Sequence, residues 1–251
     1  MVQAPQRTAF SGPALIRLLA RLTDVDVPES SQSLSDRLSQ WLGWTDAIAL
    51  SAALNNPPPA GAAGARAFGD AEESECARVR TSLANAIVGD SVLAGARRRG
   101  SAAQALPQGA PVDAPVDYAV FRQRYHSMQQ TMETGIGNLR GRLRAMLAAK
   151  TPAMARLAVV DAVMERALSE RERSLLAAVP GLLAGHFERL RQAEQQALAD
   201  AEASGDAATT KPATPGAWLD AFRKDMQSVL LAELDVRLQP VEGLLAALRT
   251  R

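Results

Sequence analysis

The residue types that carry acid–base, nucleophilic or metal chemistry are few in this sequence and lie far apart. The chain has two histidines, His126 and His186, and one cysteine, Cys76. Catalytic bases and zinc ligands work in groups, but the sequence has no cysteine pair and no HExxH-type spacing. Cys76 shares an apolar stripe with Val79, which favours a small buried hydrophobe over a nucleophile. We therefore expect no catalytic centre, no metal site and no cofactor.

Two groups of arginines are the candidates for an anion-binding patch: Arg97, Arg98, Arg99, Arg140 and Arg144. Arg140 and Arg144 are four residues apart and share one face of a helix. Such a patch would bind nucleic acid through its phosphates, with steep salt dependence. However, the formal net charge is only +1, and no aromatic residues interleave with the arginines as single-strand binding favours. Nucleic-acid binding is therefore kept as the alternative function.

The pair Trp41 and Trp44 is a third candidate. An exposed aromatic pair can stack on a ligand or dock a partner. In the alternative interpretation, Trp44 closes the chain junction beside it, and Trp41 packs with its apolar neighbours Leu38, Leu42 and Ile48. Large aromatic side chains dominate the core area of an alanine-rich protein, so the structural interpretation is favoured.

The composition predicts that helices position all of these residues. Apolar residues make up 47% of the chain and aromatic residues only 4%. Much of the apolar content is alanine, which is the best helix former and adds little buried area. The alternation that a half-buried strand requires is absent. We expect an all-α fold, an extended helical bundle with long, partly coiled-coil-like helices and proline-rich linkers.

Composition shifts divide the chain into three parts. Residues 8–54 form an N-terminal helical module. Residues 55–117 are linkers that flank a middle helix at about 70–99. Residues 118–251 form a long-helix bundle.

Local signals predict where helices begin and end. Ser33 and Asp36 form a capping box for the second helix, which either runs to about Leu54 or ends at Gly43. In the bundle, prolines should restart, kink or end the helices at Pro152, Pro180 and Pro240.

An apolar seam runs along the expected helix from Tyr118 to about Lys150, although Gly135 and Gly137 interrupt it. Spacings of three, four and seven place its members on one face: Phe121, Tyr125, Met128, Met132, Leu139 and Met146. This seam either binds a partner helix or a second copy, or is covered by residues 157–182 and 218–236 of the same chain.

The sequence predicts a cytoplasmic protein without a transmembrane segment. Arg17 and Arg21 interrupt the early apolar stretch, which argues against a signal peptide. The best charge-free apolar window, residues 174–187, is shorter than the roughly 20 residues that a membrane span requires. A single cysteine cannot form an internal disulfide and fits a reducing compartment.

The segment "RLTDVDVPESSQSLSDRLSQWLGW" (21–44) carries a family resemblance that extends over most of the chain. It resembles an uncharacterised domain-of-unknown-function family of beta- and gammaproteobacteria such as Burkholderia relatives. The resemblance brings no catalytic residues. It implies an accessory protein at the cytoplasmic side of an inner-membrane assembly similar to flagellar-motor or Tol-type proton-channel components.

These observations favour a non-catalytic helical adaptor or accessory protein that uses its helices to bind a protein partner or a second copy.

Overall fold

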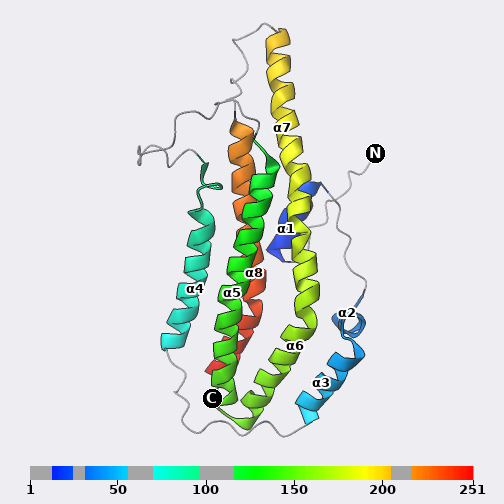
Figure 1. Cartoon of the computed structure of the whole chain (residues 1–251), viewed down its shortest axis with the longest axis vertical. Helices are drawn as coiled ribbons and strands as arrows, with labels where there is room; N and C mark the ends of the chain where they lie inside the picture. Colours follow the sequence, from blue (N-terminus) through cyan, green and yellow to red (C-terminus); the bar gives the residue numbers. More distant parts are fainter. Residues whose placement is uncertain (1–12, 25–31, 56–69, 96–115, 205–215, 251) are drawn as a thin grey trace, which may run out of the picture.

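The computed structural model of the chain describes residues 13–24, 32–55, 70–95, 116–204 and 216–250. These residues form eight α-helices and no strand (Figure 1), which confirms the all-α prediction. In chain order the helices are α1 (Ala14–Thr23), α2 (Leu34–Trp41), α3 (Trp44–Asn55), α4 (Asp70–Val88), α5 (Tyr118–Ala148), α6 (Pro152–Ala177), α7 (Val179–Ser204) and α8 (Ala217–Arg249).

The helices α5 and α8 form the centre of the bundle. α5 packs along both α8 and α6, and α8 also packs on α7. α6 and α7 form one long rod that is interrupted only at Ala178. Figure 1 shows α7 continuing the line of α6 and extending past the ends of α5 and α8. The described core is therefore a bundle of three long rods.

The apolar seam of α5 lies inside this bundle. Five of its six residues are buried, and Met146 is partly buried. Phe121, for example, meets Phe222 of α8 edge to face, with ring centroids 5.2 Å apart. The structure therefore corresponds to the intramolecular alternative, in which the rest of the bundle covers the seam. The seam is not a free surface for a partner.

The predicted restarts of the long helices are confirmed. The hydroxyl of Thr151 caps α6 by accepting a hydrogen bond from the backbone N–H of Met154 at 3.2 Å, and Pro152 occupies the first turn. Pro180 lies in the first turn of α7, directly after the break at Ala178. In contrast, α5 continues through its glycines without interruption.

The expectation that Pro240 breaks the last helix is wrong, because α8 runs through it to Arg249. A proline inside a helix costs about 3 kcal/mol, since it removes one backbone donor and crowds the preceding turn. Four apolar residues beyond the proline are buried: Val241, Leu244, Leu245 and Leu248. Each buried side chain of this size contributes about 1.5–3 kcal/mol, so their packing outweighs the cost of the proline.

The first three helices are attached to different parts of the bundle. α1 packs on α7 and α8, whereas α3 packs on α6. The capping box of α2 is confirmed, and the chain breaks at Gly43, whose N–H donates to the Asp46 carboxylate at 3.2 Å. The structural interpretation of Trp44 is wrong: this side chain is 82% exposed. No residue of α3 is buried, so no small core forms around Trp44.

The middle helix, α4, ends at Val88, earlier than the predicted 99. A turn follows it, in which the buried Asp90 carboxylate accepts hydrogen bonds from the N–H groups of Val92 and Leu93 at 3.1 and 3.2 Å. Asp90 also pairs with Arg124 of α5. Because α4 packs on both α5 and α8, it belongs to the folded bundle, although it was expected between two linkers.

Candidate functional site

The candidate site is a cleft between α6 and α8, both of which pack against α5. It encloses about 520 Å³, which falls within the roughly 300–1,000 Å³ typical of ligand sites. We call it the α6–α8 cleft. Much of its wall is apolar and is formed by Trp41, Ile136, Met164, Leu168, Leu175, Val236 and Pro240. Its charged wall residues are Glu133, Arg140, Glu165, Arg171, Glu172, Arg173 and Arg237.

A buried polar network lies beneath the cleft and fixes Arg237. The side chain of Glu233 is fully buried, and its carboxylate accepts a hydrogen bond from the Tyr125 hydroxyl at 2.7 Å. It also accepts hydrogen bonds from Gln129 Nε2 at 3.1 Å and from Arg237 Nε at 2.8 Å. Burial, followed by the charge of Glu233, raises the pKa of Tyr125 well above its ordinary value. The network therefore places one charged pair inside an apolar bundle.

Arg237 connects this network to the cleft. Its Nη1 lies 3.5 Å from Oε1 of Glu172, a wall residue from α6. Gln129 ties the same network to α6, because its Nε2 also donates to the carbonyl of Leu176 at 2.9 Å. The charges deep in the cleft are therefore held by contacts from α5, α6 and α8.

Carboxylates of α6 neutralise Arg140 and Arg144, which were two candidates for the anion patch. Arg140 donates to the Asp161 carboxylate from Nε at 2.9 Å and from Nη2 at 2.7 Å. Arg144 bonds to Asp161 and Glu165. Burial alone would lower the pKa of Arg140, but the hydrogen bonds and charge of Asp161 outweigh it and raise the pKa. These arginines join α5 to α6 and leave little charge free for phosphates.

The other anion-patch candidates, Arg97, Arg98 and Arg99, lie outside the described residues. The nucleic-acid alternative therefore has no support from the two arginines whose positions are described.

The cleft has a tryptophan and an arginine at its rim. The guanidinium carbon of Arg171 lies 4.7 Å from the centroid of the Trp41 ring, within the range of a cation–π contact. Arg171 is exposed, and within the described part of the chain no carboxylate pairs with it. This contact holds the positive charge of Arg171 at the opening of the cleft.

The two histidines and the cysteine do not meet. His126 is exposed, and its Nδ1 lies 3.2 Å from Gln129 Oε1. His186 is buried, and its Nε2 lies 2.8 Å from Oδ2 of Asp225. Cys76 is buried in α4, where burial raises its pKa. Within the described ranges, no group of three or more His, Cys, Asp or Glu side chains could hold a metal ion.

Sequence reasoning missed Glu233, Gln129 and the cleft itself. One signal was available for Glu233. Position 233 lies on the same inward stripe as Met226, Val229 and Val236, and the sequence has a carboxylate there. A charged residue at an inward position needs a partner. The partner, Tyr125, is 108 residues away, so the sequence could indicate that a polar network exists but not which residues complete it.

The described helices do not include one that combines the length and apolar character needed to cross a membrane. A family model described as "Protein of unknown function (DUF3348)" matches residues 1–250. No curated protein and no solved structure matches the chain.

Proposed function

Because this chain belongs to the DUF3348 family, whose description assigns no activity, we propose a function from its geometry. The protein is a non-catalytic helical adaptor, and its α6–α8 cleft binds an apolar helical segment of a partner protein. The observation that carries this proposal is the apolar wall of the cleft, which includes Leu175 with 58% of its surface exposed.

The length of the α6 wall of the cleft matches that of a short helix. Its wall includes residues from Met164 to Leu175 of α6, a stretch of about 16 Å at 1.5 Å per residue, or three helical turns. An amphipathic helix in an apolar groove is a common mode of recognition, with anchor side chains three or four positions apart. A short apolar helix therefore suits this wall.

The charge at the rim of the cleft indicates what kind of helix the cleft would bind. Arg171 is held by the Trp41 ring and lacks a carboxylate partner within the described residues. An acidic side chain beside the apolar face of the bound helix would pair with this guanidinium. We propose an amphipathic partner helix with an acidic residue at one edge of its apolar face.

The proposed partner belongs to an inner-membrane assembly of motor or proton-channel type, as the family resemblance implies. The adaptor would then act at the cytoplasmic side of that membrane. A non-catalytic role is supported by the separation of Cys76, His126 and His186, which lie on different helices.

Two glycines of α5 provide a matched test. Gly137 lines the cleft, and a Cβ added there would meet no atom within 4 Å. Gly141, one turn later, has equally open space but does not line the cleft. We therefore expect Gly137→Leu to fill the cleft and Gly141→Leu to leave it open. Both changes improve helix propensity, so neither should unfold the protein.

The experiment is affinity purification of wild type and both variants from the native host, with identification of the captured proteins. The proposal expects membrane-assembly subunits with wild type and with Gly141→Leu, and their loss with Gly137→Leu. Capture of the same proteins by both variants, or capture of nucleic acid alone, would overturn it.

A further inference from the structure

The helix α3 (Trp44–Asn55) is mostly apolar, and its four polar residues, Thr45, Asp46, Ser51 and Asn55, are not gathered on one face. Its only charged residue is Asp46, in the first turn. A helix with apolar residues on every side is normally covered on every side. However, among the described helices α3 makes extensive contact only with α6, and none of its residues is buried.

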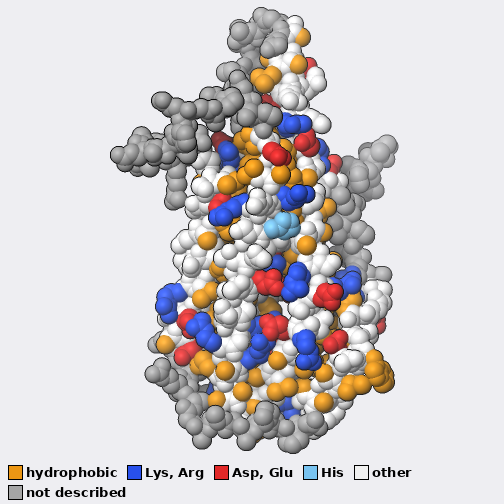
Figure 2. All heavy atoms as spheres, viewed as in Figure 1, with side chains coloured by type: hydrophobic (Ala, Val, Ile, Leu, Met, Phe, Trp, Pro, Cys, Tyr) orange, Lys and Arg blue, Asp and Glu red, His pale blue; other side chains and the backbone are white. Residues whose placement is uncertain are grey.

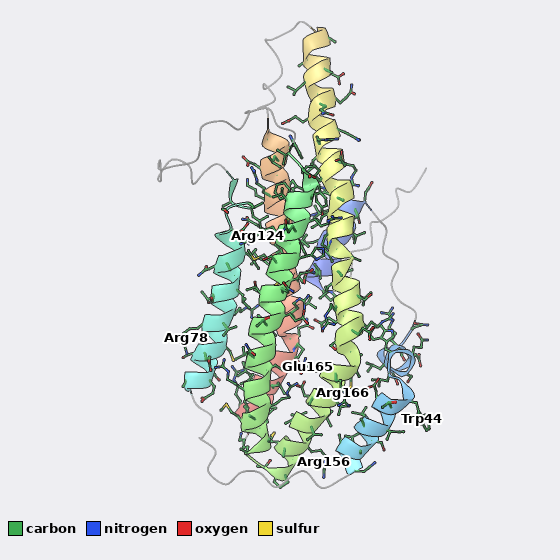
Figure 3. The ribbon with its side chains drawn as sticks, in the orientation of Figure 1. Trp44, Arg78, Arg124, Arg156, Glu165 and Arg166 are labelled. Atoms are coloured by element: carbon green, nitrogen blue, oxygen red, sulfur yellow. The ribbon has the colours of Figure 1, made fainter. Side chains whose placement is uncertain are left out.

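The side of α3 away from α6 carries exposed apolar residues. Trp44 is 82% exposed, Ile48 53% and Leu54 51%. Ala47 and Ser51 lie between them and are also exposed. Figure 3 shows Trp44 pointing away from α6, and Figure 2 shows apolar side chains projecting at this edge of the molecule. We call these five residues the α3 outer face.

We propose that the α3 outer face binds the same face of a second copy of this chain. The face carries no charge, so its complement is another uncharged apolar face rather than the charged surfaces that surround it. The chain carries such a face in α3 itself. Two identical patches related by a two-fold axis form an isologous dimer, the commonest form of self-association.

The order of large and small residues fits an antiparallel pairing. Trp44 lies near one end of α3 and Leu54 near the other, with Ala47 and Ser51 between them. When two copies run antiparallel, Trp44 of each covers Leu54 of the other. Ala47 then faces Ser51, and these small side chains allow the two helices to approach closely.

The contact is small, because each copy contributes mainly one helix of three turns. Interfaces below about 1,200 Å² belong to weak, transient complexes. We therefore expect a dimer that dissociates on dilution.

Sedimentation of the full chain over a wide range of concentrations tests this pairing. The sedimentation coefficient should rise with concentration for wild type and stay at the monomer value for Trp44→Glu and Ile48→Glu. Val88→Glu, in α4, is the matched control because Val88 is also 53% exposed, and this variant should behave as wild type. Far-ultraviolet circular dichroism checks that every variant keeps its helices. A wild type that remains monomeric at the highest concentration overturns the proposal.

Crosslinking tests the antiparallel register. A mixture of Ala47→Cys and Ser51→Cys proteins, treated with a short bismaleimide, should give more crosslinked dimer than either protein alone. The native Cys76 is buried and should not compete. Equal crosslinking in the mixture and in the separate proteins would contradict the antiparallel arrangement.

Discussion

The hydroxyl of Tyr125 lies 2.7 Å from the carboxylate of Glu233, and both side chains are almost completely shielded from water. This contact joins α5 to α8, the two central helices of the bundle. Arg237 supplies the opposite charge from one turn further along α8. Where α5 meets α8 at these residues, the bundle is therefore stabilised by a hydrogen-bonded ion pair as well as by apolar packing.

Removing the positive partner of this network should destabilise the fold strongly. Arg237→Ala leaves Glu233 buried without its counter-charge, which should lower the free energy of unfolding by about 3–5 kcal/mol. Arg173→Ala is the matched control, because Arg173 forms an exposed pair with Glu133 and should cost less than about 1 kcal/mol. Urea unfolding measures both values. Similar losses for the two variants would show that the network contributes no more than a surface pair.

Stability should fall above pH 10. Burial raises the pKa of Tyr118 to about 12, and burial with the charge of Glu233 raises that of Tyr125. An unfolded tyrosine has a pKa near 10. Between these values the unfolded chain has lost phenolic protons that the folded chain retains, so the free energy of unfolding falls as pH rises.

The variant Tyr125→Phe isolates the contribution of Tyr125 to this effect. Urea unfolding at several pH values should give a lower stability at pH 8, because the Glu233 carboxylate loses one donor, and a shallower decline above pH 10. A decline as steep as that of wild type would assign the pH dependence to other groups.

A charge placed in the seam of α5 should unfold the chain. Met132 is 1% exposed, and Met132→Glu would bury a carboxylate without a partner, which costs several kcal/mol. Thr131→Glu, at the adjacent exposed position, is the control and should keep the helical content. Circular dichroism and thermal unfolding distinguish the two. A folded Met132→Glu protein with altered self-association would show that the seam is a partner surface.

Replacing Pro240 should stabilise α8. Proline has no backbone N–H, so the Val236 carbonyl lacks its usual helical donor. Pro240→Ala restores that donor and should raise the free energy of unfolding by about 2 kcal/mol, after allowance for the greater entropy of the unfolded alanine variant. Gln239→Ala, at the exposed neighbouring position, should change it by less than about 0.5 kcal/mol. A destabilised Pro240→Ala protein would mean that the bundle requires a bend at this position.

Features set within one helical turn could be predicted from the sequence. The capping box of Ser33 and Asp36 and the restart at Thr151 and Pro152 depend on atoms three residues apart, so local patterns were sufficient. The apolar periodicity of α5 likewise identified five of its buried residues, but not Gln129, Ile136, Leu143 or Leu147. These signals gave the fold class and the positions of the long helices.

Features set by distant parts of the chain could not be predicted in this way. Whether Pro240 ends a helix depends on the packing of the turns beyond it. The exposure of Trp44 depends on which side of α3 contacts α6. The α6–α8 cleft combines side chains from four helices, and its rim contact joins Trp41 to Arg171, 130 positions later. A single sequence carries no spacing rule for such contacts.

The three tryptophans occupy three different surroundings, and this gives the protein a separate optical reporter for each of its parts. Trp218 is packed against Phe187 in the bundle, with ring centroids 4.9 Å apart; Trp41 lies under a guanidinium at the rim of the cleft, and Trp44 faces water. Indole emission moves to longer wavelength as water surrounds the ring. Proteins that retain one tryptophan each would therefore report separately on unfolding of the core, occupation of the cleft and pairing of α3.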